Sequence, residues 1–337
     1  MNEQIQQIRR DSRNRSLGLV VAETKTFAPQ DRHNVVQAVL HLAKQDPMRA
    51  FTTAMHIVAS QIPGEASDMG QSGLSLPLDQ SRLVGILHRQ TARRMHCFPS
   101  ATAVRDGDAW VVSADALLGV DPSSVRRWCV LAYTDSDNID AFWIDPAAEG
   151  VHQHQQPVAG RVAPFNAYTF TLHKVRVAES GHVRLGRADA PGPILLRLAR
   201  VYPAMASALC CGIGHATRTV AGRHVGTSAR ASTYPIVRCR TTERLSRVDA
   251  LLLTSEVLLR DIANDLVKGG LSTAARRSVR HLHRVAMDSS IAAISLASRS
   301  VPKLSNIDHA SLHRYRRDAA ATCALAANFD TVHALSA

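Results

Sequence analysis

The sequence predicts an α+β protein, mainly α, with a short N-terminal helical region, an antiparallel β middle domain and a C-terminal four-helix bundle. Two patterns predict this order. Apolar residues recur at helical spacing near both ends of the chain, whereas the middle holds short stretches rich in Val, Trp, Tyr and Phe. Composition agrees, because Ala supplies much of the apolar content and aromatics are only 4%, which favours close-packed helices.

The N-terminal region predicts two helices. Residues 1–28 are polar and Arg-rich without a stable period, so we expect a frayed arm. From Asp31 to Ala43 the apolar residues share one helical face. The pair Asp46-Pro47 then predicts a helix start, because the Asp oxygen accepts from unpaired N–H groups and Pro loses nothing at the first position. We expect this second helix to end near Ser60.

A loop and a third, shorter helix should follow. Residues 61–80 gather Gly, Pro, Ser and Asp, which predicts a loop. The stretch from Ser81 to Arg94 is interpreted as a short helix.

The middle of the chain predicts an antiparallel β unit of about 90 residues. Turn signals such as Asp106-Gly107-Asp108 and Asp135-Ser-Asp-Asn138 separate the apolar stretches. The expected strands are Thr102–Arg105, Ala109–Ser113, Trp128–Tyr133, Ala141–Ile144 and Tyr168–Val177.

Helical periodicity returns after Pro191-Gly-Pro193 and continues to the end of the sequence. Glycine pairs, capping residues and Pro302 separate the helical stretches. Short links between helices of this length predict an antiparallel four-helix bundle. The expected helices are Ile194 to about Ala221, Val237–Val267, Thr273 to about Ser298, and Ser311 to about Leu335.

The charge is strongly basic, with a formal net charge of +12 and a pI near 10.0. Only five of the 40 basic residues are Lys. Such a balance raises the expectation of an anionic partner, although Arg and Ala richness together can equally reflect genomic base composition. The N-terminus lacks the apolar core of a secretory signal and no run looks long enough to span a bilayer, so we expect a soluble, cytoplasmic protein.

The six cysteines form no CxxC pair and no Cys/His cluster with zinc spacing. In a reducing compartment they are interpreted as buried thiols. The sequence therefore predicts neither a disulfide framework nor a metal site.

Four stretches, in this order, resemble the acyl-CoA dehydrogenase superfamily. LAKQDPMRAFTTAMH (Leu42–His56) resembles the family's Asp-Pro helix with a His near its end. TAVRDGDAWVVSADALLG (Thr102–Gly119) is similar to its flavin-facing hairpin, and FTLHKVRV (Phe170–Val177) to the strand that closes its β domain. SLHRYRRDAA (Ser311–Ala320) resembles the last-helix signature shared with the related flavin monooxygenases.

The resemblance implies a flavoenzyme in which FAD removes a hydride from the β carbon of an acyl thioester while a base removes the α proton. Counting back from Arg317-Asp318, the base position falls on His309, with Asp308 beside it. Imidazole titrates near neutrality and a buried Asp can have a raised pKa, so either could be the catalytic base. The alternative is an exposed loop His and an Asp that caps the helix.

The resemblance also suggests cofactor-binding positions. Leu118-Gly119 takes the place of the family's aromatic and hydroxyl pair after the hairpin, and Arg93–Ala101 that of the flavin loop before it. Arg223 and Gly226 look like a shortened form of the segment that reaches the FAD pyrophosphate of a neighbouring subunit, where a guanidinium pairs with phosphate oxygens. A solvated Arg at a helix end is the alternative.

Two other motifs are given structural interpretations. Gly212-Ile-Gly214 lacks a preceding strand and a third glycine, which favours close helix packing over phosphate binding. His152-Gln-His154 is expected in an exposed turn. Basic residues between Arg276 and Arg284 are spread over several faces without nearby aromatics, so no nucleic-acid partner is expected.

The expected domains are 1–95, a truncated helical domain; 96–190, the β domain; and 191–337, the helix bundle. The expected function is an acyl-CoA dehydrogenase-like oxidoreductase, FAD-linked, acting on acyl-CoA or a carrier-bound acyl substrate as a homodimer or homotetramer. Two alternatives stay open: a flavin-dependent monooxygenase of the same fold, and a flavin-free member with a non-redox catalytic, binding or scaffolding role.

Overall fold

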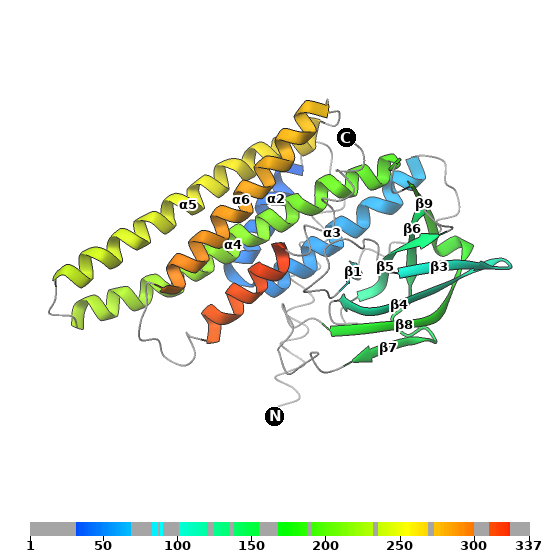
Figure 1. Cartoon of the computed structure of the whole chain (residues 1–337), viewed down its shortest axis with the longest axis horizontal. Coiled ribbons are helices and arrows are strands. Elements are labelled where there is room, and N and C mark those ends of the chain that lie inside the picture. The colour runs from blue at the N-terminus through cyan, green and yellow to red at the C-terminus, as the bar shows by residue number, and fades with distance from the viewer. Residues whose placement is uncertain are drawn as a thin grey trace.

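Helices and one curved mixed sheet make up the protein in the computed structural model (Figure 1). The residues described are 32–68, 83–86, 88–89, 101–119, 125–134, 138–154, 168–187, 190–231, 235–268, 273–299 and 310–323. The labelled helices are α2 (Arg32–Gln45), α3 (Pro47–Asp68), α4 (Pro193–Ala231), α5 (Pro235–Lys268) and α6 (Thr273–Arg299), and residues 310–323 form a further helix.

Helix α2 and the start of α3 confirm the sequence prediction. The Arg49 backbone N–H donates to Asp46 Oδ1 at 3.2 Å, so Asp46 caps α3 as expected. The predicted end near Ser60 was wrong, because α3 continues through Pro63 and Gly64 to Asp68. Ile62 is fully buried, which shows that tertiary packing here outweighs the poor helix propensity of the two residues that follow it.

The sheet has the strand order β7-β8-β4-β3-β5-β6-β9. Two short strands lie off this path: β1 pairs with β5, and β2 pairs with β4. The strands of the sheet are β1 (Leu83–Ile86), β2 (His88–Arg89), β3 (Ala101–Asp106), β4 (Ala109–Gly119), β5 (Val125–Thr134), β6 (Asn138–Ile144), β7 (Val151–His154), β8 (Tyr168–Ala178) and β9 (His182–Arg187).

The slot between β4 and β5 is filled by two successive segments. Strand β3 pairs antiparallel with the first part of β4 and parallel with the last part of β5. Strands β1 and β2 occupy the rest of this slot. Strand β1 pairs parallel with the first part of β5, and β2 pairs antiparallel with the end of β4. The sheet is therefore mixed, and the prediction of a purely antiparallel unit was wrong.

Two further sequence predictions in this region are corrected, and one strand was missed. The stretch Ser81–Arg94 contains strands β1 and β2 instead of a helix, since a run of about four apolar residues satisfies either periodicity. Residues His152–His154 belong to the edge strand β7 instead of a turn, although they are exposed as expected. Strand β9 was not predicted at all.

The long helices α4, α5 and α6 lie alongside one another and extend away from the sheet (Figure 1). The prediction that Gly212 and Gly214 permit close helix packing is confirmed. A Cβ built on Gly212 would lie 2.4 Å from Ala43 Cβ on α2, and one on Gly214 would lie 2.5 Å from Leu252 Cδ2 on α5. Glycine therefore lets α4 contact both neighbouring helices at almost the same level.

The main hydrophobic core of the described residues runs through the sheet and helices α2 to α6, and a smaller cluster lies among α4, α5 and α6. Within the described residues, Pro193–Arg223 of α4 is long and apolar enough by composition to cross a membrane, contrary to the expectation that no run reaches that length. Most of this segment is buried inside the protein, which accounts for its apolar character.

Candidate functional site

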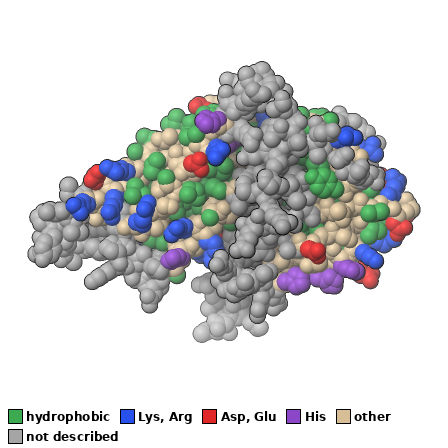
Figure 2. Space-filling view, viewed as in Figure 1, with side chains coloured by type: hydrophobic (Ala, Val, Ile, Leu, Met, Phe, Trp, Pro, Cys, Tyr) green, Lys and Arg blue, Asp and Glu red, His purple; other side chains and the backbone are tan. Residues whose placement is uncertain are grey.

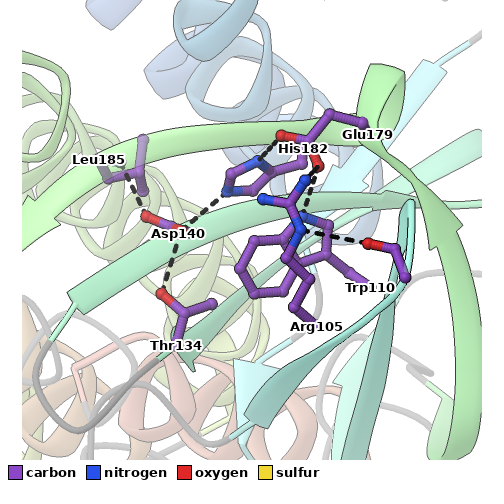
Figure 3. A network of polar contacts seen from close by, with 8 residues as sticks. Arg105, Trp110, Thr134, Asp140, Glu179, His182 and Leu185 are labelled. Atoms are coloured by element: carbon purple, nitrogen blue, oxygen red, sulfur yellow. Dashed lines mark hydrogen bonds and ion pairs between the residues drawn. The ribbon is translucent and has the colours of Figure 1, made fainter.

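The sheet contains a buried polar network centred on Asp140 of β6 (Figure 3). Asp140 Oδ2 accepts from Thr134 Oγ1 at 3.0 Å and lies 2.8 Å from His182 Nε2, and Oδ1 accepts from the Leu185 N–H at 3.3 Å. The Asp140 and His182 side chains are only 3% and 6% exposed. A buried carboxylate with this many partners has its desolvation offset, so it can fix β6 against β9.

Aromatic rings and a second carboxylate enclose His182 on its other side. Its ring lies 4.8 Å from the ring centroid of Trp110 and 5.1 Å from that of Phe142. Glu179 accepts from Trp110 Nε1 at 2.9 Å and lies 3.4 Å from His182 Nδ1 (Figure 3). Both imidazole nitrogens are therefore occupied by protein groups, which fits a structural role better than proton transfer to a substrate.

This network was missed by the sequence reasoning. The available signal was Asp140 itself, a charged residue inside the strand NIDAFWI, whose burial requires partners. The partners come from β5 and β9, and nothing in their local spacing points to β6.

Helix α3 is fastened to the sheet by His56. The Val84 backbone N–H donates to His56 Nδ1 at 3.0 Å. Burial lowers the pKa of His56 to about 4. The imidazole is therefore neutral at pH 7 and acts as an acceptor for β1.

The predicted cofactor-binding residues fall on two separate elements. Leu118 and Gly119 end β4, where Leu118 pairs with both His88 and Thr169, and Gly119 pairs with Tyr168. Arg223 and Gly226 lie within α4, because that helix runs on to Ala231. The expected end near Ala221 was wrong, so Arg223 is an exposed residue on the helix instead of following it.

The described residues fit FAD at one end only. Arg223 offers an exposed guanidinium suited to a pyrophosphate. At the ring end, Leu118-Gly119 brings no hydroxyl. The buried indole N–H groups of Trp128 and Trp143 have no hydrogen-bond partner among the described residues. In the register of β5 and β6, Trp128 lies opposite Ile144, and Trp143 lies opposite Cys129. Because neighbouring residues of a strand point to opposite faces, the two indoles lie on opposite faces of the sheet. These donors do not converge on one ligand.

The predicted catalytic residues Asp308 and His309 lie outside the described residues, as does the loop segment 93–100. The structure therefore neither places them beside the cofactor positions nor separates them. The helix that follows, residues 310–323, packs on α4, with Cys323 Sγ 3.7 Å from Cys210 Sγ.

Figure 2 shows Lys and Arg side chains over both the helical end and the sheet end of one face, with acidic side chains among them. Several described basic residues are paired: Arg218 forms two hydrogen bonds with Asp249 at 2.8 and 2.9 Å, and Arg247 contacts Glu243. Part of the positive charge of the described helices is thus paired with neighbouring carboxylates.

Known structures share the fold of this chain, but no sequence comparison reveals a close relative. No protein-family model and no curated protein matches the sequence. The 3-HSA hydroxylase from Rhodococcus sp. RHA1 is similar at 16% identity and a TM-score of 0.68, covering 88% of this chain and 79% of that one. A glutaryl-coenzyme A dehydrogenase, in its glutaryl-CoA complex, is similar at 17% identity and a TM-score of 0.67, covering 91% and 79%.

XiaF from a Streptomyces species, solved with FADH2 and glycerol, is similar at 15% identity and a TM-score of 0.60, covering 90% of this chain and 80% of that one. Helices beside a mixed sheet give this chain an α+β architecture, and it superposes on these three structures over most of their length. The chain has the acyl-CoA dehydrogenase-like fold, as the four resembling stretches predicted.

Proposed function

We propose that the protein is a flavin-linked oxidoreductase that acts on an acyl thioester, either acyl-CoA or a carrier-bound acyl group. The observation that carries this proposal is the shared fold over about nine-tenths of the chain with enzymes solved with glutaryl-CoA and with FADH2. FAD would supply the hydride acceptor.

The chain's own residues would hold the cofactor and move a proton. Arg223 would pair with the FAD pyrophosphate, since its exposed guanidinium presents two parallel donors. His309, or Asp308 beside it, would accept the α proton of the acyl group.

A flavin-dependent monooxygenase is the second candidate, and one observation favours it. The first bundle helix, α4, is another position at which the family carries its base, and it contains no acidic residue between Ala199 and Gly214. A monooxygenase needs no carboxylate at that place. The similarity to a hydroxylase agrees with this alternative.

Flavin content of the purified full-length protein is the decisive test. Bound or added FAD with flavin absorbance supports both redox candidates, whereas a colourless protein that takes up no FAD would overturn them and leave the non-redox alternative. Anaerobic bleaching by acyl-CoA would then separate a dehydrogenase from a monooxygenase.

Two substitutions test the assigned residues. Arg223→Ala should weaken FAD binding roughly 10- to 100-fold, the effect of losing a charge-assisted hydrogen bond. Arg244→Ala is the matched control: it removes an exposed Arg from a different helix, α5, and should leave FAD binding unchanged. Unchanged turnover in His309→Gln would remove His309 from the catalytic role.

The proposal includes assembly and location. We expect a homodimer or homotetramer in the cytoplasm, with the helices after residue 191 forming the four-helix bundle. Sedimentation of the purified protein tests the first point, and a monomer would contradict it.

A further inference from the structure

A polar cluster lies among three helices, apart from the cofactor positions. It consists of Cys211 and His215 of α4, Glu256 of α5 and Lys44 of α2. The ligand atoms of Cys211, His215 and Glu256 all lie within 4.8 Å of one another. Among the described residues this is the group whose side chains could hold a metal ion together.

The fold assembles the cluster through the glycine contacts described above. Cys211 and His215 are one helical turn apart, so they share a face of α4. Gly212 brings Ala43 of α2 against that face, which places the neighbouring Lys44 over it. Lys44 Nζ then reaches Glu256 Oε1 at 2.9 Å, and the same oxygen lies 2.8 Å from His215 Nε2.

The contact between His215 and Glu256 is short but does not satisfy the imidazole. Nε2 is buried and has no hydrogen-bond partner of suitable direction among the described residues, although Glu256 is close. A ring nitrogen held near a carboxylate and a thiol without a directed hydrogen bond is poised for a different partner. That partner must accept electron pairs from all three atoms.

Electrostatics keep two of the three ligands in the form a metal needs. Burial, and then the charge of Lys44, lower the pKa of His215, so the imidazole is neutral at pH 7. Burial tends to raise the pKa of Glu256, but the hydrogen bond and charge of Lys44 outweigh it and the pKa is lowered. Burial raises the pKa of the Cys211 thiol to about 12, so metal binding would have to release its proton.

We propose that Cys211, His215 and Glu256 bind a divalent transition metal of the Zn²⁺ class. A thiolate, an imidazole and a carboxylate are ligands that Zn²⁺ accepts together, and three protein ligands leave a fourth position open. Tetrahedral coordination would set the ligand atoms about 3.3–3.7 Å apart, which small side-chain rotations can reach from the observed arrangement. The His215 and Glu256 side chains are 27% and 24% exposed, so the cluster lies close to the surface, although Cys211 is fully buried.

Lys44 is the competitor for this site. Its ammonium occupies the Glu256 oxygen that the metal would use, so the ion must displace this contact. Removing the Lys44 charge should therefore strengthen metal binding. A purely structural cluster would show no such gain.

Cobalt binding to the full-length protein tests the proposal, because a thiolate ligand gives Co²⁺ a characteristic charge-transfer band in the near ultraviolet. We expect the band in the wild-type protein and its loss in Cys211→Ala and in the more exposed His215→Ala. Cys210→Ala is the matched control, since its thiol lies on the same helix but faces Cys323. Lys44→Met should bind Co²⁺ and Zn²⁺ roughly five- to tenfold more tightly.

Each other outcome overturns the proposal. A band that persists in Cys211→Ala would place the metal elsewhere. No band in the wild-type protein, or a band only in Lys44→Met, would show that the ion pair closes the cluster to metals. Circular dichroism of each variant checks folding, and FAD content, measured separately, keeps this result independent of the proposed redox function.

Discussion

The sheet and the helices bury polar groups in different ways. Around Asp140 each polar atom has a partner, and the Asp140 and His182 side chains are almost completely buried. Around Glu256 the side chains of Lys44, His215 and Glu256 are about a quarter exposed. One Glu256 oxygen contacts both Lys44 and His215, and His215 Nε2 lacks a directed hydrogen bond. A satisfied network specifies one structure, whereas an incompletely satisfied one leaves room for a ligand.

The largest effect should come from breaking the satisfied network. Asp140→Ala leaves Thr134 Oγ1, His182 Nε2 and the Leu185 N–H without their acceptor, so the free energy of unfolding should fall by about 3–5 kcal/mol. Asp140→Asn, which keeps an acceptor oxygen, should cost less. Urea unfolding measures both, and a loss below about 1 kcal/mol for Asp140→Ala would refute a stabilising role for the network.

The contact between α3 and the sheet should make stability depend on pH. The folded-state pKa of His56, about 4, lies below the unfolded value of 6.5, so only the unfolded chain binds this proton between those values. Stability should therefore be complete above pH 6.5 and fall by about 3 kcal/mol as the pH drops to 4. His56→Asn keeps an acceptor near Nδ1 but does not titrate, and should flatten the curve; parallel wild-type and variant curves would contradict this.

The close contact between α4 and α2 at Gly212 should contribute to the stability of the helical region. Gly212→Ala places a Cβ 2.7 Å from Leu40 O and 2.4 Å from Ala43 Cβ, which should cost about 1–3 kcal/mol and displace Lys44 from Glu256. Gly222→Ala, also within α4, meets only the flexible end of Arg218 and should be neutral or slightly stabilising. Equal melting temperatures for the two variants would argue against the contact.

The smallest effect should come from the ion pair of the helical cluster. Lys44→Met should change the free energy of unfolding by less than about 1 kcal/mol, because both partners are about a quarter exposed. A loss of several kcal/mol in urea unfolding would make this cluster a structural network like that of Asp140.

Sequence periodicity predicted the helices well and the sheet less well. Helices α5 and α6 follow from apolar spacing over many turns and from capping residues. Strands β1 and β2 are too short for periodicity to separate them from a helix, and their pairing with β5 and β4 is set by residues far along the chain. The extension of α3 past Pro63 depends on packing that local propensity does not contain.

The polar sites were harder to predict because they form across elements. Cys211 and His215 show helical spacing in the sequence, but Glu256 and Lys44 join them only through the packing of α5 and α2 on α4. The search for metal-ligand spacings considered local motifs only, and such motifs do not reveal a cluster formed by separate helices. Arg223 and Leu118-Gly119 came from family resemblance, and the roles assigned to them stay predictions.

The filling of the slot between β4 and β5 has a consequence for how the protein can be divided. Strand β1 follows the helical N-terminal region yet supplies backbone hydrogen bonds to β5 in the middle of the sheet. A fragment of residues 96–190 would retain β3 but expose unpaired N–H and C=O groups along the first part of β5 and the end of β4. Such open strand edges promote aggregation. The sheet and the helices before it should therefore unfold together, as one cooperative unit.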